Sequence, residues 1–473
     1  MSGGSAHAAL KKALVKAVGR DRFLDGPARL VAYECDALTH FKSRPSCVVL
    51  PESAAEVVAV VKACTAAGVP YTPRGAGTGL SGGAVPAEGG VLIELVRMNR
   101  ILEIDAANRT AKVEPGVINQ RLSDAVRPLG LYYAPDPSSQ TACSIGGNVA
   151  ENAGGPHCFK YGATERHVLA VTTVLPDGSI ETFGAAHEAA HGLDLRGVFL
   201  GSEGTLGVAV ELVCRLLPLP AATETLLAPY PDIESACRAV AEIVAAGVTA
   251  SAIEALDRRT IEAVEASVFR AGYPLDAGAV LLIELDGGVE DVAEASRRVK
   301  AILVRNGALN IQTARDAYER KLLWRGRKGA FGAMGRLAPD LYVQDAVVPR
   351  TKLPEILSAT CEICDRYGLR LANVFHAGDG NLHPNICYDG RNADEVARVT
   401  AAGREIMEAC LKAGGTLSGE HGIGLEKKEF MPLLFNEDDL EVMGRVRNAF
   451  NPKNLLNPGK LLPTPRACVE VSR

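Results

Sequence analysis

Two histidines that flank a short glycine-rich turn are the residues of this sequence best placed to do chemistry. Residues 374–384 read VFHAGDGNLHP, and apolar residues on both sides of Gly-Asp-Gly-Asn are typical of a β-hairpin. If residues 378–381 form a four-residue loop, Ala377 pairs with Leu382 and His376 stands directly opposite His383. Side chains opposite each other on neighbouring strands have Cβ atoms about 5 Å apart. Two imidazoles at that separation can hold one divalent ion such as zinc.

A second glycine-flanked segment offers a third metal ligand. Residues 418–424 read SGEHGIG, so that glycines let the backbone bring Glu420 and His421 close to a bound group. Two histidines and one glutamate, with one coordination position left open, make up a catalytic rather than a structural zinc site. The alternative is that the histidines are ordinary turn or core residues, as a single histidine usually is. Four candidate groups in two such segments favour a metal site.

The composition excludes several classes of protein. The 473 residues are 47% hydrophobic and 23% charged, which predicts a soluble protein of two or three domains. Apolar runs fall short of the roughly 18 residues that cross a bilayer, and residues 1–19 lack the apolar core of a secretory signal. We therefore expect a cytoplasmic protein. A net charge of −5 gives no basic surface for nucleic acid.

The cysteines bear on electron transfer. Twelve are scattered along the chain, and only Cys361 and Cys364 form a CxxC pair. An iron–sulfur cluster needs four thiolates, so this chain is not expected to hold one. We expect most of the cysteines to be reduced core residues. Electrons that leave this protein toward iron–sulfur centres would need another subunit.

The pattern of elements changes near residue 220. Before it, a helix capped by Ser53 and short β-like runs at 91–95, 101–105 and 109–113 predict an α+β domain over residues 1–220, including an N-terminal helical segment. A proline-dense stretch, residues 216–231, suits a boundary. Beyond it, helices alternate with strands in a pattern that predicts a ferredoxin-like sheet with helices on one face, over residues 221–463. Residues 464–473 form a tail.

Three glycine-rich segments lie in the first domain, at 73–83, 135–155 and 201–207. The first contains G-x-G-x-x-G from Gly77 to Gly82, which invites a Rossmann interpretation. A Rossmann loop opens a helix, whereas Gly83 and Pro86 follow here, so we reject that interpretation. Exposed backbone N–H groups can still cradle a pyrophosphate. The three segments indicate close backbone approach to a long, flat ligand that carries phosphate.

These ordered motifs resemble the FAD-linked oxidase family, which has the vanillyl-alcohol-oxidase-type flavin fold. Within that family the sequence is most similar to the catalytic flavoprotein subunits of bacterial glycolate oxidases, over nearly its whole length. The stretches that carry the resemblance are 73–83, 135–155, 201–207, 324–336, 373–384, 418–427 and 451–460. The resemblance implies a two-domain α+β flavoprotein, with an FAD-binding PCMH-type domain followed by a ferredoxin-like substrate or cap domain.

The resemblance also implies which residues bind FAD. The pyrophosphate is expected at the first glycine-rich loop. The implied contacts are Pro73, Arg74, Gly75, Ala76, Gly77, Thr78, Gly79, Pro137, Ser138, Ser144, Gly146, Gly147, Asn152, Gly204, Gly207 and, near the isoalloxazine, Asn457. Some relatives tether the flavin through a histidine in the first loop. Thr78 and its neighbours include no histidine or cysteine, which favours non-covalent FAD.

For the reacting centre, the resemblance to the metal-dependent 2-hydroxy-acid dehydrogenases of the family implies a role for each of six residues. The metal, zinc or manganese, is expected on His376, His383 and Glu420. His421 matches the catalytic base. Arg327 matches the arginine that clamps the substrate carboxylate, and Asn385 a substrate-contacting asparagine. The alternative for Arg327 is a surface charge on a helix.

Two departures bear on the substrate. Relatives that oxidise 2-hydroxyglutarate carry a lysine where this chain has Val343 and a threonine where it has Phe331. Without those partners a second carboxylate would be buried unpaired, which is costly. The departures favour a small monocarboxylate.

The predicted function is therefore FAD-dependent oxidation of a small 2-hydroxy acid, glycolate to glyoxylate first and D-lactate second, with hydride transfer to the flavin. The resemblance implies that electrons pass to a second flavin-type subunit and an iron–sulfur subunit of a glycolate oxidase complex, on the inner face of the membrane. A stand-alone dehydrogenase that reduces a quinone is the alternative within the same chemistry. Of other classes, a non-catalytic flavin-binding electron-transfer subunit would lack the histidine and Glu-His motifs, and a metal-binding structural protein would not need the glycine-rich segments.

Overall fold

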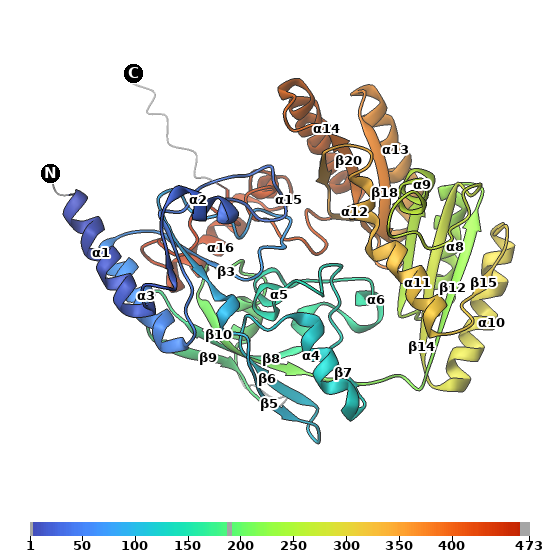
Figure 1. The fold of residues 1–473 in the computed structure, drawn as a ribbon. Helices are drawn as coiled ribbons and strands as arrows, with labels where there is room; N and C mark the ends of the chain where they lie inside the picture. Colours follow the sequence, from blue (N-terminus) through green and yellow to red (C-terminus); the bar gives the residue numbers. More distant parts are fainter. Residues whose placement is uncertain (1–2, 187–191, 464–473) are drawn as a thin grey trace.

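The structure, a computed structural model, describes residues 3–186 and 192–463. The predicted tail, residues 464–473, lies outside the described residues. Figure 1 shows two bodies side by side, one formed mainly by the first half of the chain and the other by a large sheet with its helices. No helix within the described ranges is long and apolar enough to cross a membrane.

The first body contains two main sheets. One has the order β1-β2-β4-β3 and the other the order β5-β6-β10-β8-β9, while β7 and β11 form a separate pair. The strands are β1 (Phe23–Leu24), β2 (Cys47–Val49), β3 (Tyr71–Arg74), β4 (Val91–Glu94), β5 (Ile101–Asp105), β6 (Thr110–Val113), β7 (Leu131–Tyr132), β8 (Val168–Val174), β9 (Ile180–Gly184), β10 (Val208–Arg215) and β11 (Leu217–Pro218). The helices are α1 (Gly3–Val18), α2 (Pro27–Leu30), α3 (Ala54–Ala67), α4 (Asn119–Val126), α5 (Ile145–Glu151), α6 (Cys158–Tyr161) and α7 (Leu195–Phe199).

Local sequence signals explain much of this body. Ser53 caps α3, because its side chain accepts a hydrogen bond from the backbone N–H of Glu56. The first glycine-rich loop runs from β3 to β4 without a helix, as the sequence predicts. The loop therefore presents bare backbone rather than a Rossmann helix.

The second body is built on a nine-stranded sheet. Its strands are β12 (Ala222–Tyr230), β13 (Ala252–Asp257), β14 (Ala279–Gly287), β15 (Gln312–Thr313), β16 (Asp340–Val343), β17 (Ala346–Val347), β18 (Arg370–His376), β19 (Asn381–Leu382) and β20 (Pro384–Tyr388). The helices of the second half are α8 (Ile233–Ala245), α9 (Arg258–Glu265), α10 (Val289–Arg305), α11 (Ala317–Lys328), α12 (Ala330–Met334), α13 (Leu353–Arg366), α14 (Ala393–Lys412), α15 (Met431–Leu434) and α16 (Glu437–Phe450).

Helices cover both faces of this sheet, which corrects the expectation of helices on one face. Residues of α8, α10, α13 and α14 share one core cluster with one side of the strands, and residues of α9, α11 and α12 share another with the opposite side. The sequence carries the reason. The first seven residues of β14, AVLLIEL, are all buried, as in a strand covered on both faces, rather than alternating.

The end of the described chain returns to the first body. The backbone N–H of Tyr71 donates to Leu455 O at 2.9 Å, and that of Asn457 donates to Tyr71 O at 2.8 Å. Asn451 Nδ2 also reaches Thr205 O at 3.2 Å. In Figure 1, α15 and α16 accordingly lie beside the first body, and Met431 of α15 also belongs to the core cluster of the large sheet.

Candidate active site

The three predicted metal ligands meet where β18 ends. His376 closes β18, His383 lies between β19 and β20, and Glu420 comes from the loop after α14. The Nε2 atoms of His376 and His383 lie 3.1 and 3.2 Å from the same Glu420 oxygen, Oε1. One ligand atom from each residue lies within 4.8 Å of the others. Two imidazole nitrogens and a carboxylate in this arrangement fit one divalent ion.

The strand register that brings the histidines together differs from the predicted one. His376 pairs with Asn381, and Asn373 with Pro384, so the turn is residues 377–380 and His383 is not directly opposite His376. The reason lies in the turn, because Gly380 takes the positive φ of 78° that ends it one residue earlier. His383 is then a diagonal neighbour on the same face. Its ring centroid still lies 5.1 Å from that of His376.

Asp345, just beyond β16, holds the loop that carries Glu420 and His421. Its buried carboxylate accepts hydrogen bonds from Ser418 Oγ at 2.7 Å and from the backbone N–H groups of Gly419, Glu420 and His421 at 3.0, 3.2 and 3.0 Å. Lys427 Nζ adds a further bond at 3.1 Å. Asp345 also lies near His383 and His421 in a second group of suitable ligand types. Since its carboxylate is already taken up by these donors, Asp345 serves the loop rather than an ion.

Glycine lets Glu420 approach the first body. A Cβ atom on Gly154, which follows α5, would lie 2.6 Å from Glu420 Oε2. Any larger residue there would therefore collide with the carboxylate. Glu420, one of the predicted metal ligands, is thus in direct contact with the second glycine-rich segment.

His421 lies against His383 and faces the large cavity. The two rings are stacked, with centroids 5.0 Å apart and planes 7° apart. Burial lowers the pKa of His421 to about 4, an effect that the carboxylate of Asp345 opposes and His383 reinforces. The imidazole is therefore neutral at neutral pH. A neutral imidazole can accept a proton.

Arg327 is fully buried, which excludes the alternative of a surface charge. It lies on α11, and Glu254 of β13 accepts from its Nε at 2.6 Å. Nη2 lies 2.6 Å from the same carboxylate. Nη1 is buried and finds no hydrogen-bond partner among the described residues. A guanidinium bound along one edge keeps the other edge for an anion.

Asn385 lies in β20, two residues after His383, and is also fully buried. Its Nδ2 donates to His383 O at 2.6 Å, while its Oδ1 has no partner within the described part of the chain. In this structure, therefore, the amide group supports the backbone at His383.

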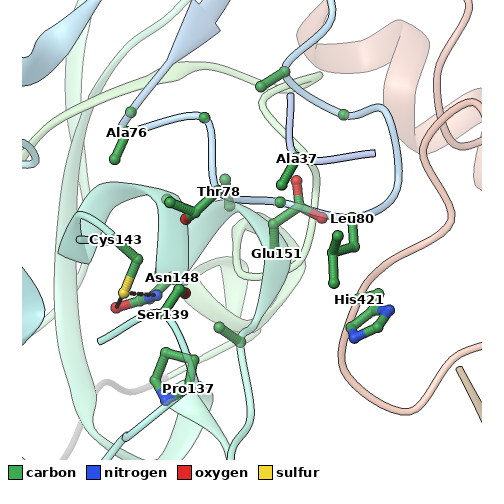
Figure 2. A pocket seen from close by; sticks show the side chains of 18 of the residues that line it. Ala37, Ala76, Thr78, Leu80, Pro137, Ser139, Cys143, Asn148, Glu151 and His421 are labelled. Atoms are coloured by element: carbon green, nitrogen blue, oxygen red, sulfur yellow. Dashed lines mark hydrogen bonds between the residues drawn. The ribbon is translucent and has the colours of Figure 1, made fainter. Parts of the chain in front are cut away.

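A cavity of about 700 Å³ runs between the two bodies. All three glycine-rich segments line it, together with Lys328, Phe331, Val343, Glu420 and His421 from the second half of the chain. Figure 2 shows Ala76 and Thr78 of the first segment and Pro137 and Ser139 of the second around this space, with His421 on the opposite side. His376, His383 and Arg327 are not lining residues, but both histidines contact Glu420.

The cavity collects most of the predicted FAD contacts. The lining residues among them are Pro73, Arg74, Gly75, Ala76, Gly77, Thr78, Gly79, Pro137, Ser138, Ser144, Gly146, Gly147, Gly204 and Gly207. Asn152 and Asn457 do not line it. The Asn152 side chain binds Glu165 at 2.8 Å, and Asn457 Nδ2 donates to Glu203 O at 2.7 Å and to Gly83 O at 3.0 Å. Asn457 thus joins loops that border the cavity.

Sequence reasoning missed Glu254 and Asp345. The sequence did hint at Glu254, because it stands between apolar residues in the strand sequence AIEALD, where a buried carboxylate needs a partner. Asp345 gave no comparable sign. Its partners lie 73 to 82 residues further along the chain.

The comparisons with known proteins identify the family of each half of the chain. Residues 45–184 match the FAD binding domain family, and residues 219–461 match the family of FAD linked oxidases, C-terminal domain. The chain is 48% identical over 441 residues to glycolate oxidase subunit GlcD of Escherichia coli K12, covering 93% of this chain and 88% of that protein. It is 39% identical to GlcD of Bacillus subtilis, with 96% of each chain covered.

More distant relatives carry another activity in their names, and solved structures share the fold. A D-lactate dehydrogenase of Anaerostipes hadrus is 35% identical, over 89% of this chain and 90% of that one. The structure of p-cresol methylhydroxylase with bound substrate has a TM-score of 0.84 at 18% identity, with 97% of each chain covered. The 4-ethylphenol oxidase of Gulosibacter chungangensis has a TM-score of 0.82 at 19% identity, with 98% of each chain covered. The two matched domains and these relatives show that the chain belongs to the FAD-linked oxidase family.

Proposed function

We propose that this protein oxidises a small 2-hydroxy acid, glycolate to glyoxylate in the first place, with FAD in the cavity between the two bodies and a divalent metal, zinc or manganese, on His376, His383 and Glu420. The observation that carries the proposal is the convergence of those three ligand atoms beside Arg327, whose Nη1 is buried without a partner among the described residues. A metal beside the Arg327 guanidinium suits a 2-hydroxy acid, because the metal can bind the hydroxyl group and the guanidinium the neighbouring carboxylate.

The chain's own residues supply binding and proton transfer. Arg327 would bind the substrate carboxylate through its free edge, and Asn385 would hold the backbone at His383 in place. His421, neutral and facing the cavity, would accept the hydroxyl proton at a ring nitrogen. When bound, the metal supplies Lewis-acid polarisation of the hydroxyl group, and FAD supplies the hydride acceptor.

The cavity suits non-covalent FAD. Its volume of about 700 Å³ lies within the range of cofactor sites, and its walls include the glycine-rich backbone of the first body. Among the described lining residues the one cysteine is Cys143. Burial raises the pKa of its thiol, so the reactive thiolate is scarce. Covalent attachment through this residue is therefore disfavoured.

Two lining residues favour a small substrate. Phe331 and Val343 border the cavity, and the Phe331 ring lies 6.2 Å from that of His383. Apolar groups next to the reacting centre would leave a second carboxylate without a partner, at a cost of about 2 kcal/mol or more. D-lactate, which adds one methyl group to glycolate, is the second candidate, and the name of the Anaerostipes relative supports it.

The electron acceptor lies outside this chain. The two GlcD relatives are named as subunits of glycolate oxidase, which supports a multi-subunit complex. We propose that a second flavin-type subunit and an iron–sulfur subunit of that complex receive the electrons. The protein would then work in the cytoplasm, on the inner face of the membrane, through those partners. A quinone could replace them in a stand-alone enzyme.

Anaerobic flavin absorbance of the purified protein tests the proposal. Glycolate, D-lactate, L-lactate and D-2-hydroxyglutarate are added separately, before and after treatment with a chelator. We expect glycolate to bleach the flavin, the chelator to abolish this bleaching, and zinc or manganese to restore it. Preferential bleaching by D-lactate would make D-lactate the first candidate substrate and glycolate the second. A yellow protein that none of the four acids bleaches would contradict the proposal and favour a non-catalytic flavin subunit.

A further inference from the structure

Glu254 contacts both halves of the proposed reacting centre. It lies in β13, directly opposite His376 of β18 in the antiparallel register, so that the two side chains share one face of the sheet. Its Oε1 lies 2.8 Å from His376 Nδ1, and its Oε2 lies 2.6 Å from Arg327 Nε. Glu254 and Arg327 are fully buried and His376 is nearly so.

The contact with His376 selects which nitrogen faces the metal. A carboxylate accepts but does not donate, so Nδ1 of His376 must carry the proton in this contact. With Nδ1 committed to Glu254, Nε2 is the nitrogen that faces Glu420, and it would offer its lone pair to a cation that took the place of its present contact with Glu420. Carboxylates that orient a metal-binding histidine in this way commonly change metal affinity by 10- to 100-fold.

The contact with Arg327 selects which edge of the guanidinium is free. Glu254 takes the edge formed by Nε and Nη2, and leaves Nη1 without a partner among the described residues. The planar fork cannot rotate away without breaking both contacts with Glu254. The same carboxylate therefore points one histidine nitrogen toward the metal and one guanidinium edge toward the substrate.

We propose that Glu254 is a positioning residue that couples metal binding to substrate binding, through one carboxylate shared by His376 and Arg327. This inference rests on the proposed function, because it takes the metal on His376 and the substrate carboxylate on Arg327. Loss of Glu254 weakens both interactions together, whereas an ordinary buried ion pair would affect only folding stability.

Glu254→Gln tests the coupling, with Glu284→Gln as the matched control. Glu284 is a buried glutamate on the adjacent strand β14 that binds Arg320 of the same helix α11, with no hydrogen bond to His376 or Arg327. Zinc and manganese affinities of the FAD-loaded protein are measured by competition with a chromogenic chelator, and the KM for glycolate by flavin reduction. Thermal unfolding of each variant reports stability separately.

We expect Glu254→Gln to weaken metal affinity by 10- to 100-fold and to raise the KM by roughly tenfold. Glu284→Gln should leave metal affinity within about threefold, even if it lowers the unfolding temperature. If Glu254→Gln does not fold, Glu254→Asp replaces it, because aspartate keeps the charge on a side chain shorter by one methylene group. Metal affinity is then expected to fall, and the KM to rise, by smaller factors.

Unchanged metal affinity in the folded Glu254 variant, or an equal loss in both glutamate variants, would overturn the coupling. The proposed function fails in a different way. If Glu254→Gln weakens the metal but none of the 2-hydroxy acids bleaches the wild-type flavin, the positioning of His376 stands and the substrate is wrong. If glycolate bleaches the wild-type flavin and Glu254→Gln binds metal normally, the function stands and the coupling is wrong.

Discussion

At the scale of single residues, Arg327 has a geometry that lysine cannot copy. Its guanidinium binds Glu254 with two nitrogens and keeps Nη1 free of partners within the described part of the chain. Arg327→Lys keeps the charge but loses the fork, so we expect the KM for glycolate to rise by roughly thirtyfold, or about 2 kcal/mol. Stopped-flow flavin reduction over a range of glycolate concentrations measures this. An unchanged KM would show that Arg327 does not bind the substrate carboxylate.

Asp345 offers a second prediction at this scale, because one carboxylate accepts bonds from four consecutive residues of the 418–421 loop and from Lys427. Asp345→Asn removes the nearest charge partner of the buried Lys427 and places an amide N–H₂ among donors. We expect a loss of about 3 kcal/mol of unfolding free energy. We also expect weaker metal binding, since the loop carries Glu420.

Asp340→Asn is the control for this variant. Asp340 lies at the start of β16, is partly exposed, and accepts one backbone bond, from Gly390 at 2.9 Å. Urea unfolding of both variants gives the free energies. Equal and small losses would show that Asp345 is an ordinary polar contact.

At the scale of elements, the turn after His421 depends on glycine. Gly422 has a φ of 90°, and a Cβ atom there would lie 2.4 Å from Glu151 Oε2 and 2.9 Å from Glu203 Oε1. Gly422→Ala therefore adds both strain and collision, and we expect it to cost about 2 kcal/mol and to displace His421. Thermal unfolding and flavin reduction by glycolate are the measurements.

Gly414→Ala separates the two contributions. Gly414 has a similar φ of 84°, but the atom nearest to a Cβ placed there would be Pro349 Cγ at 3.9 Å, so only strain is added. A loss of flavin reduction in the Gly422 variant alone is expected. Equal effects in both variants would mean that the contacts with Glu151 and Glu203 are unimportant.

Elements were more predictable from sequence than their arrangement. Capping residues and short β-like runs gave elements such as α3, capped by Ser53 as predicted, and β5, predicted and found at 101–105, together with the bare loop after β3. The predicted register of the turn between β18 and β19 was wrong. The same sequence pattern fits a glycine turn that ends at residue 380 as well as one that ends at residue 381. The helices on the second face of the large sheet were missed as well.

From residue types and spacing alone, the candidate site was predictable only where its residues lie in glycine-rich motifs, whereas Arg327 and Asn385 were predicted from the family resemblance. The three predicted metal ligands and His421 stand in such motifs, and the structure brings these four residues together. Glu254 and Asp345 were not found, because they act on residues far along the chain and stand in no motif. Their roles, and those of the predicted FAD contacts, stay predictions until they are tested by substitution.

At the scale of the whole molecule, His157 ties the two bodies together. It follows the second glycine-rich segment, and its ring nitrogens lie 2.8 Å from Asp136 of the same body and 3.0 Å from Glu284 of the large sheet. Lys328 also contacts Asp136, and Arg320 contacts Glu284. Burial lowers the pKa of His157, but the two carboxylates outweigh this and raise it from 6.5 to about 10.

The raised pKa sets the direction of a pH effect. A histidine whose pKa is higher in the folded protein contributes stability that is complete below about pH 6.5 and is lost as the pH rises toward 10. The pKa values of Asp136 and Glu284 are lowered, so both stay ionised over this range. We expect stability to fall between pH 6.5 and 10, and His157→Gln to flatten that fall.

Thermal unfolding at a series of pH values measures the effect. His7→Gln, at an exposed position of α1, is the control and should keep the wild-type profile. A His157→Gln profile parallel to that of the wild type would show that this histidine does not set the pH dependence.

The return of the chain's end to the first body has a consequence for biosynthesis. Asn451, Leu455 and Asn457 supply contacts to Tyr71 and Thr205, and Lys460 Nζ donates to Val85 O near the first glycine-rich loop. A ribosome releases these residues hundreds of positions after the loops that they hold. The nascent first body therefore lacks these contacts around its cavity until the large sheet has been translated. Loading of FAD is then expected to follow completion of the chain, so that a prematurely terminated product stays empty.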